Sequence, residues 1–483
     1  MSTPSLRDYQ QVGVEDIRAA FRQHRSVLFV LPTGGGKTFA FSYMAAASAA
    51  RGRRVLLLVH RNELVEQASA SFHQFGIEHG IMARGRSETR QAVQIGMVGT
   101  VVRRLDRIYP PDFVIVDEAH HATAAQYRKI VEAFPRARIL GVTATPQRTD
   151  GAGLGDIFSA LVVGPGMRDL IDRNALSPYR LFIPPQQIDT SSIKTVAGDY
   201  DRKQLATVSD RAVVTGDAVE HYRRLCNGQA VAFCTSLEHA EHVAAQFRDS
   251  GIPAERIDGR MTPFERSATL ARYAADETRV LASCDLISEG FDLPAIQAAI
   301  LLRPTQSVIV YLQQVGRALR PSPGKPHAVI LDHAGNALRH GFPDDQREWT
   351  LEGRRKGERV VLNGPAVTIC RDCFAAYLST LHVCPHCGGA KTNNSRTVEC
   401  RDGELVEITP AMERQGELRT LPFREAVASL RTIEDVKLMR AARGYKPGWA
   451  IRTAMETLKM SPHEAVRALG YHPGILSRIR HGT

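Results

Sequence analysis

Short apolar runs alternate with helix-like segments along two stretches of the chain. The first stretch extends from Ser26 to Val142 and contains the runs SVLFVLP, RVLLLVH, QIGMVGT, FVIVDEA and ILGVTAT. The second begins after residue 228 and contains AVAFCTS, AERIDGR, RVLASCD, AAILLRP and AVILDHA. Buried strands separated by helices are typical of a parallel sheet with helices on both faces. The pattern therefore predicts an α/β fold with two parallel-sheet domains in tandem.

The size and composition of the chain agree with several ordinary globular domains. The chain has 483 residues, of which 43% are hydrophobic and 23% are charged, and this length allows two or three domains. The longest apolar runs, such as VLFVL and VLLLV, are too short to cross a bilayer. The N-terminus lacks the pattern of a secretory leader. We therefore expect no membrane partner and a cytoplasmic location.

The charge of the chain suggests a class of partner. The formal net charge is +11, and the calculated isoelectric point is about 9.4. Clustered Lys and Arg side chains gain affinity for polyanions by releasing counterions from phosphates. Because many basic proteins bind no polyanion, the charge alone does not separate a nucleic-acid-binding protein from any other basic protein.

A glycine-rich stretch, LPTGGGKT, follows the first apolar run and precedes helix-forming sequence. The spacing G-x-x-x-x-G-K-[ST] would place a glycine where Leu31 stands. Three consecutive glycines still allow the backbone to curl around a phosphate at the positive end of a helix. The lysine would reach the β- and γ-phosphates, and the last threonine would bind Mg²⁺. A turn without a ligand is the alternative. The predicted phosphate-binding residues are Thr33, Gly34, Gly35, Gly36, Lys37 and Thr38.

Two adjacent carboxylates end the apolar run in VIVDEAHH. Asp117 would hold Mg²⁺ through a water shell, and Glu118 would orient or deprotonate the attacking water. His120 would link the nucleotide to the next motif. An Asp-Glu pair after a strand is also common in solvated turns, so this interpretation depends on the glycine-rich stretch that precedes it.

Five motifs occur in the order found in superfamily 2 helicases. They are PTGGGKT, DEAH, TATP (Thr143 to Pro146), SEGFDLP (Ser288 to Pro294) and QQVGRALR (Gln313 to Arg320). Residues 6 to 335 thus resemble this family, in which the P-loop commonly reads P-T-G-x-G-K-T, so Leu31 is normal there. The resemblance implies two RecA-like domains, ATP and Mg²⁺ as cofactors, and an ATP-driven helicase or translocase.

The resemblance also implies roles for individual residues. In LRDYQ, Gln10 would bond the adenine base, and Arg7 or Tyr9 would pack beside it. Gly290 and Asp292 match motif V, which touches both the nucleotide and the strand.

Motif VI would supply the second half of the catalytic set. Gln313, Arg317 and Arg320 match this motif, whose arginines reach across an interdomain cleft to the γ-phosphate. A solvated helix face is the alternative for the two arginines. The catalytic residues implied are therefore Glu118, Lys37, Gln313, Arg317 and Arg320.

A nucleotide held by two domains could drive movement along a strand, because hydrolysis would release one domain from the other. Small hydroxyl groups and helix N-termini suit contacts with the phosphates of that strand. Helix caps and surface residues have the same signature in a sequence. The candidate strand contacts are His60, Arg61, Gln67, Thr100, Thr235 and Ser236.

Four of the eight cysteines form two C-x-x-C pairs. The spacing Cys370-x2-Cys373-x10-Cys384-x2-Cys387 suits a closed tetrahedral Zn²⁺ site, with an iron–sulfur cluster as the alternative. A motor followed by a cysteine cluster is similar to the RadD-type helicases of bacterial DNA repair, as are the tracts LRDYQQ and VILDHAGN. This likeness implies that the chain acts on DNA, single-stranded or branched, and that it works near single-strand-binding or recombination proteins. An RNA helicase, a duplex translocase and an ATP-switched DNA-binding regulator remain alternatives.

The C-terminal tail mixes basic and aromatic residues from about residue 440, which suits a nucleic-acid surface. The stretch SPHEAVRALGYHPGILSRIRHG resembles a helix-turn-helix, with Gly470 at the turn and His472 to Ile479 as the second helix. A small helical bundle that packs Leu469, Ile475 and Ile479 against the motor or the zinc module is the alternative.

The predicted domain order follows from these patterns. We expect a RecA-like ATP-binding domain at 1–160, a connector at 161–205, a second RecA-like domain at 206–340, a linker at 341–365, a zinc module at 366–392 and a helical basic region at 393–483.

Overall fold

The structure is a computed structural model in which the chain divides into two compact units. The first unit comprises Met1–Tyr179, Ile188–Asn336 and Pro343–Arg359, and the second comprises Arg180–Gln187, Ala337–Phe342 and Val360–Thr483. The structure describes residues 4–86, 90–121, 125–148, 152–183, 193, 195–196, 199–201, 204–205, 212–226, 228–284, 296–352, 367–369, 376–378, 406–408, 414–415, 417–419, 421–472 and 475.

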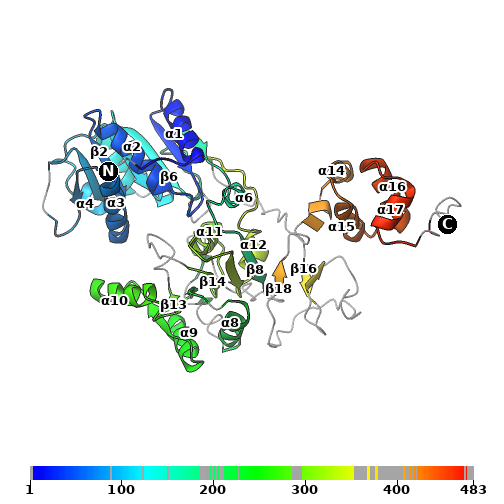
Figure 1. The fold of residues 1–483 in the computed structure, drawn as a ribbon. Helices are drawn as coiled ribbons and strands as arrows, with labels where there is room; N and C mark the ends of the chain where they lie inside the picture. The colour runs from blue at the N-terminus through cyan, green and yellow to red at the C-terminus, as the bar shows by residue number, and fades with distance from the viewer. Residues whose placement is uncertain are drawn as a thin grey trace. The chain divides into compact units, whose positions relative to one another are not determined.

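The first unit begins with a parallel sheet of order β3-β4-β2-β5-β6-β1-β7. Figure 1 labels two of its strands, β2 and β6. Every residue of β1, β2 and β5 is buried, because helices cover both faces of a parallel sheet. The strands are β1 (Ser26–Val30), β2 (Val55–Val59), β3 (His79–Met82), β4 (Val93–Met97), β5 (Phe113–Asp117), β6 (Arg138–Thr143) and β7 (Ala160–Val163).

Helices connect these strands. They are α1 (Asp8–Ala20), α2 (Lys37–Ala49), α3 (Asn62–Gln74), α4 (Val98–Val102) and α5 (Ala125–Ala133), with a 3-10 turn, η1 (Ala119–His121), after β5. The parallel register places the ends of β1, β5 and β6 at the same edge of the sheet, since Val30 pairs with Thr143 and Asp117 with Val142. The glycine loop and the two carboxylates are thereby brought together.

A second set of parallel strands follows, in the order β12-β13-β11-β14-β15. These strands are β11 (Ala230–Phe233), β12 (Ala254–Ile257), β13 (Val280–Ser283), β14 (Ala298–Leu301) and β15 (Ala328–Asp332). The helices that precede or connect them in the chain are α8 (Ala212–Leu225), α9 (Leu237–Asp249), α10 (Pro263–Ala274) and α11 (Val308–Ala318). A further helix, α12 (Asn336–His340), follows, and apart from Asn336 it belongs to the second unit. The prediction of two parallel α/β sheets in tandem is therefore confirmed.

The segment expected to be a connector contains regular structure. β7 begins at its boundary and is the edge strand beside β1, with Val27 opposite Ala160. α6 (Met167–Asp172) follows, and β9 (Thr195–Val196) pairs antiparallel with β10 (Asp199–Tyr200). The sequence pattern did not reveal β7, because the strand has four residues and is only partly buried.

In the part of the second unit that the structure describes, short helices near the C-terminal end pack around their own apolar cluster, which includes Val436, Met439, Ile451 and Val466. The helices are α14 (Phe423–Ala428), α15 (Ile433–Arg443), α16 (Pro447–Thr457) and α17 (Pro462–Ala468). Two antiparallel strand pairs precede them, β16 (Val367–Ile369) with β17 (Ala376–Leu378), and β8 (Tyr179–Ile183) with β18 (Val406–Ile408).

The tail predicted to form a helix-turn-helix is described only in part. Gly470 has a φ of 77°, in the left-handed region expected of a turn. Leu469 belongs to the apolar cluster around α14 to α17, and Ile475 packs against it, whereas Ile479 lies outside the described residues. Most of the second helix, between His472 and Ile479, lies outside the described residues.

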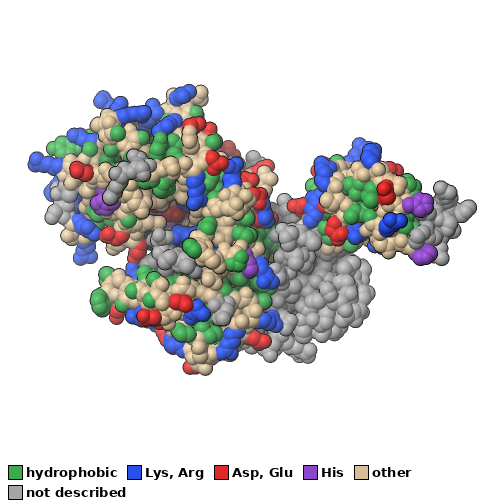
Figure 2. All heavy atoms as spheres, viewed as in Figure 1, with side chains coloured by type: hydrophobic (Ala, Val, Ile, Leu, Met, Phe, Trp, Pro, Cys, Tyr) green, Lys and Arg blue, Asp and Glu red, His purple; other side chains and the backbone are tan. Residues whose placement is uncertain are grey.

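Two properties of the surface bear on partners. Within the described residues, no helix combines the length and apolar character that crossing a membrane requires. Figure 2 shows Lys and Arg side chains interspersed with Asp and Glu over the face in view, so the positive charge of the chain is not gathered there into one patch.

Candidate active site

The loop between β1 and α2 adopts a conformation that requires glycine. Gly34 and Gly36 have φ values of 86° and 84°, which residues with a Cβ rarely adopt. A Cβ on Gly36 would lie 2.3 Å from Nε2 of Gln10, and one on Gly34 would lie 2.8 Å from Cδ2 of Leu176. The loop therefore leaves its backbone open around the N-terminus of α2, where unpaired N–H groups favour an anion. This cradle fits a phosphate chain.

α1 holds this loop from behind. Tyr9 donates from its hydroxyl to the carbonyl of Gly35 at 3.0 Å, and Gln10 Nε2 donates to the carbonyls of Gly35 and Gly36, both at 3.3 Å. The side-chain oxygen of Gln10 accepts from the backbone N–H of Arg7 at 3.0 Å. Both ends of the Gln10 amide are thus bonded to the protein, whereas the sequence suggested that Gln10 bonds a base.

Lys37 begins α2 and turns back toward the loop. Its ammonium donates to the carbonyl of Leu31 at 3.2 Å, and the residue is buried. Burial lowers the pKa of Lys37, while the nearby charges of Glu118 and Asp117 oppose that shift. Because burial leaves this cation poorly solvated, a phosphate chain bound beside it would favour its charged form.

Asp117 lies in a setting that disfavours its own charge. Burial, and then the charge of Glu118, raise the pKa of Asp117 to about 7. Oε2 of Glu118 is buried and makes no hydrogen bond among the described residues, and His120 Nδ1 lies 3.4 Å from it. A divalent cation bound here would compensate the negative charge of the two carboxylates. Asp117, together with the hydroxyl of Thr38 in the same cavity, therefore fits Mg²⁺.

The backbone at Glu118 is strained. Its φ is 47°, a conformation that costs a non-glycine residue free energy and that often occurs at functional sites. The backbone N–H of Glu118 donates to Asp117 Oδ1 at 3.0 Å, which helps to hold the turn. His120 then reaches the TATP motif, with its Nδ1 3.2 Å from Oγ1 of Thr143. This contact agrees with the expected link to the next motif.

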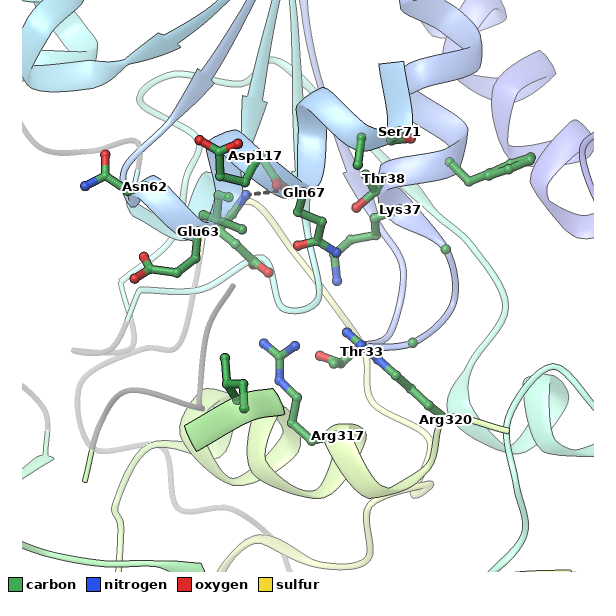
Figure 3. Close-up of a pocket in the computed structure, with 18 of the residues that line it drawn as sticks. Thr33, Lys37, Thr38, Asn62, Glu63, Gln67, Ser71, Asp117, Arg317 and Arg320 are labelled. Atoms are coloured by element: carbon green, nitrogen blue, oxygen red, sulfur yellow. Dashed lines mark hydrogen bonds between the residues drawn. The ribbon is translucent and has the colours of Figure 1, made fainter. Parts of the chain in front are cut away.

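One cavity of about 970 Å³ in the first unit contains these groups (Figure 3). Arg317 and Arg320, from α11 and the residues just after it, also line the cavity, where the guanidinium group of Arg320 lies beside Thr33 and that of Arg317 points into the cavity. The contact is close on this side, since a Cβ on Gly316 would lie 2.6 Å from Cβ of Thr33. The predicted residues that line the cavity are Thr33, Gly34, Gly36, Lys37, Thr38, Gln67, Asp117, Glu118, Arg317 and Arg320.

Similarity to known proteins agrees with this arrangement. Residues 3–148 match the family model for the type III restriction enzyme res subunit, and residues 217–322 match that for the helicase conserved C-terminal domain. A 51.5 kDa protein of a Lactococcus phage is 33% identical over 362 residues, which cover 74% of this chain and 76% of that protein. The chain belongs to the superfamily 2 helicases. This family consists of ATP-hydrolysing enzymes.

Two more distant likenesses are consistent with that assignment. A Saccharomyces cerevisiae protein named as a candidate ATP-dependent helicase, IRC3, is 28% identical over 69% of this chain, and the match spans only 52% of the yeast protein. A fragment of a candidate HsdR subunit of a type I restriction enzyme from Vibrio vulnificus shares the fold, with a TM-score of 0.55 at 22% identity. That match covers 71% of this chain and 67% of the fragment.

Some predicted site residues of this helicase lie elsewhere or are not described. Gln313 lies in α11 and is buried, but it does not line the cavity, and its Nε2 makes no hydrogen bond among the described residues. Gly290 and Asp292 of motif V lie outside the described residues. So do the zinc candidates Cys370, Cys373, Cys384 and Cys387. Within the described part of the chain, no group of three or more His, Cys, Asp or Glu side chains is placed to hold a metal ion.

The candidate strand contacts of the helicase have diverse surroundings. Ser236 caps α9 by accepting from the N–H of His239 at 3.0 Å, and Oγ1 of Thr235 lies 2.9 Å from Nδ1 of the same histidine. Thr100 is buried in α4. His60 and Arg61 follow β2 and are half-buried, with the His60 ring 4.3 Å from that of His121. For Ser236, the local alternative of a helix cap is therefore realised in the structure, and Thr235 contacts the ring of a residue in the same helix.

Sequence reasoning missed one part of the cavity wall. One face of α3 along its length and the first two turns of α10 line the cavity, and Arg266 of α10 forms an ion pair with Glu63 of α3. The sequence contains one signal for α10, the capping box in which Thr262 accepts from the N–H of Glu265 at 3.2 Å. That signal predicts where the helix begins, but not what it faces.

Proposed function

We propose that this chain is an ATP-driven DNA helicase or translocase. The proposal rests on one observation, the single cavity in which the glycine loop, the Asp117–Glu118 pair and the two arginines of motif VI meet. Groups of these kinds in one enclosure suit phosphoryl transfer, because each side of a phosphate chain meets positive charge and the metal-binding carboxylate lies beside it.

Each residue in the cavity has a chemical task in this proposal. When bound, Mg²⁺-ATP would supply the phosphate bond that is broken, and Thr38 and Asp117 would hold the metal ion. Glu118 orients a water molecule and accepts its proton. Lys37 pairs with the β- and γ-phosphates. Arg317 and Arg320 stabilise the charge that develops on the γ-phosphate, a contribution of about 10³- to 10⁵-fold in rate in other NTPases.

An ATPase assay across a panel of nucleic acids tests this function. Steady-state hydrolysis is measured with no nucleic acid, single-stranded DNA, duplex DNA, forked DNA and RNA, and strand displacement is followed in parallel. We expect the largest stimulation with single-stranded or forked DNA, and none in a Lys37→Ala variant. Stimulation by RNA alone would show that the chain is an RNA helicase. Stimulation by duplex DNA without strand displacement would show a translocase.

A place in DNA repair is a finer proposal. It is supported by the similarity of LRDYQQ, the motif VI tract and VILDHAGN to the RadD-type helicases. In this role the chain would act in the cytoplasm on single-stranded or branched DNA, near single-strand-binding or recombination proteins. Fluorescence anisotropy with purified single-strand-binding protein tests the partner, and binding no tighter than that of an unrelated basic protein would argue against it.

We also propose one structural Zn²⁺ ion held by Cys370, Cys373, Cys384 and Cys387, on the basis of their spacing. Metal analysis of the purified chain should find about one zinc per polypeptide, lost in Cys384→Ser. Iron in place of zinc would indicate an iron–sulfur cluster. A folded preparation without either metal would contradict the site. A matched Cys400→Ser variant, outside the C-x-x-C pairs, should retain the metal.

A further inference from the structure

The two arginines of the cavity depend on how the end of α11 is held. Arg317 lies in the last turn of the helix, which ends at Ala318, and Arg320 lies just beyond the C-cap residue, Leu319. The last carbonyls of an α-helix have no partners within the helix and need donors from elsewhere. A loosely held helix end would move both guanidinium groups relative to the glycine loop.

The N-terminal end of α11 is held by a separate network. Ser307 caps the helix, and Asp199 accepts hydrogen bonds from Arg303 Nη2 at 3.1 Å and from Thr305 Oγ1 at 2.9 Å in the loop before it. The backbone N–H of Thr305 donates to the side chain of Asn336 at 3.0 Å. This end of the helix is therefore fixed independently of the end that carries the arginines.

At the C-terminal end, one ammonium group satisfies several carbonyls. Lys325 Nζ donates to the carbonyl of Arg320 at 2.8 Å, to that of Ile296 at 2.7 Å and to that of Ala318. The carbonyl between them, that of Leu319, accepts from the N–H of Ser177 at 2.8 Å. Three consecutive carbonyls at the helix end thus have donors, and Lys325 supplies two of them.

A tight turn returns the chain so that Lys325 can reach these carbonyls. The backbone N–H of Lys325 donates to the carbonyl of Ser322 at 3.2 Å, and Gly324 has a φ of 76°. Lysine suits this position because it carries three N–H donors and a positive charge, which the negative end of a helix favours. The bond to Ile296, which precedes β14, ties the helix end to the sheet.

We propose that Lys325 is a positioning residue for Arg317 and Arg320. This inference rests on the proposed ATPase function of the same cavity. Lys325 does not line the cavity, and it acts through the backbone of α11. Loss of its ammonium should therefore slow the chemical step more than it weakens binding of ATP, because the arginines are needed most in the transition state.

The surroundings of Lys325 leave its charge sensitive to pH. Burial lowers the pKa of Lys325 to about 8, and the thiol of Cys226, at the end of α8, is the group that opposes this shift. Burial in turn raises the pKa of Cys226, with Arg279 and Lys325 acting against that rise. Deprotonation leaves the amine with two N–H donors for three carbonyls.

The test uses Lys325→Met, which keeps the length of the side chain without its donors, and Lys325→Arg, which keeps charge and donors. Turnover and KM for ATP are measured with saturating single-stranded DNA, and affinity is measured with a fluorescent ATP analogue. We expect kcat of Lys325→Met to fall by about 10²-fold, the loss typical of a small misplacement of catalytic groups, while ATP affinity changes by less than about threefold. Lys325→Arg should recover much of the rate.

Controls separate this role from folding and from the function itself. Lys129→Met, an exposed position on α5, should behave as the parent does. If Lys325→Met does not fold, Lys325→Gln, which keeps two N–H donors, replaces it with the same expected split between kcat and affinity. Parental kcat in either folded variant, or an equal loss of kcat and affinity, overturns the inference. No ATP hydrolysis by the parent with any nucleic acid overturns the proposed function instead.

Discussion

At the scale of single residues, the site combines conformations that ordinary residues avoid. Gly36 occupies the left-handed region, and Gln10 occupies the space where a side chain would lie. Glu118 occupies the same region despite having a Cβ. Such strain costs stability. Because both strained positions lie at the cavity, one in the phosphate loop and one beside the buried Asp117, a functional role explains why they are retained. These two positions therefore give the sharpest tests of the site.

Glu118→Gln should separate binding from turnover. The amide keeps the size of the side chain but cannot accept a proton from water, so we expect ATP hydrolysis to fall by about 10²- to 10⁴-fold with ATP binding retained. Steady-state phosphate release and binding of a fluorescent ATP analogue measure the two effects. Glu132→Gln, an exposed position on α5, is the control. Hydrolysis by Glu118→Gln at the parental rate would refute the proposed role.

Gly36→Ala should abolish nucleotide binding through a collision rather than through strain alone. The added methyl group would lie 2.3 Å from Nε2 of Gln10, which bonds the loop carbonyls. Gly52→Ala is a matched control, since Gly52 has a φ of 71° but its Cβ would meet no atom within 4 Å. We expect both variants to lose about 1 kcal/mol of stability, and only Gly36→Ala to lose ATP affinity. Similar ATP affinities in the two variants would contradict this account.

Sequence reasoning identified the groups of the cavity better than their contacts. Gly34, Lys37 and Asp117 follow strands in recognisable motifs, and such motifs describe local backbone that folds alike in many proteins. The contacts of Gln10 depend instead on how α1 packs against the loop, which no short motif specifies. Lys325 escaped notice for the same reason, because its acceptors are carbonyls, and a sequence does not show where carbonyls point.

At the scale of elements, contacts at the ends of helices fix the position of one element relative to the next. α15 begins with a capping box in which Thr432 accepts from the N–H of Asp435 at 3.1 Å. Asp435 accepts in return from the N–H of Thr432 at 2.8 Å and from that of Arg431 at 2.9 Å. Arg414 Nε donates to the same carboxylate at 2.9 Å. One carboxylate therefore joins the start of α15 to the segment before α14.

Asp435→Asn should loosen this helical unit. The amide loses the ion pair with Arg414 and accepts hydrogen bonds less well, so we expect a loss of about 2 kcal/mol, typical of hydrogen bonds to a charged group. Hydrogen exchange measured by mass spectrometry on the intact chain should be faster than in the parent in α14 and α15, and it should be unchanged in β1 and β5. Glu434→Gln is the control, since exposed Glu434 pairs only across one helical turn with Lys437, at 3.3 Å. Unchanged protection in Asp435→Asn would contradict the role.

The same carboxylate predicts a sensitivity to acid. Burial would raise the pKa of Asp435, but hydrogen bonds from Arg414, Arg431 and Thr432 outweigh it and lower the pKa to about 2, from an ordinary 3.8. A lowered folded pKa means that the stabilisation is present above pH 3.8 and is lost as the pH falls toward 2. Pepsin, which is active in this range, should therefore begin to cut α14 and α15 of the parent between these values. In Asp435→Asn the cutting should not depend on pH there.

Elements were predicted best where apolar runs are long and buried. β1, β2 and β5 are buried throughout, and each corresponds to a run recognised in the sequence. β7 and the antiparallel pair of β9 and β10 were not recognised, because they are short and lie among glycine and proline residues. Thr235 and Ser236 suggested strand contacts, yet the hydrogen bonds that they make are local to the start of α9.

At the scale of the whole molecule, the proposed motor and a DNA-binding regulator differ in how they should hold nucleic acid. The chain carries a net charge of +11, and basic and acidic side chains are interspersed on the face in view in Figure 2. A motor contacts phosphates, which carry no sequence information, whereas a regulator reads base edges. Dependence on salt and on sequence therefore distinguishes the two functions without a view of the complex.

Binding of the full chain to DNA should fall steeply with salt and little with sequence. Each phosphate that a protein neutralises adds about 0.7 to the slope of log K against log salt on single strands, so six to ten contacts cost about 3 × 10²- to 10⁴-fold in affinity between 50 and 200 mM. We expect similar slopes on several unrelated oligonucleotides, measured with Glu118→Gln held in the ATP-bound state. Because ATP should close the cavity and hydrolysis should open it, affinity should also be higher with ATP than with ADP. Salt-resistant binding to one sequence, equal with either nucleotide, would instead assign the interaction to a regulator, with ATP no longer the source of movement.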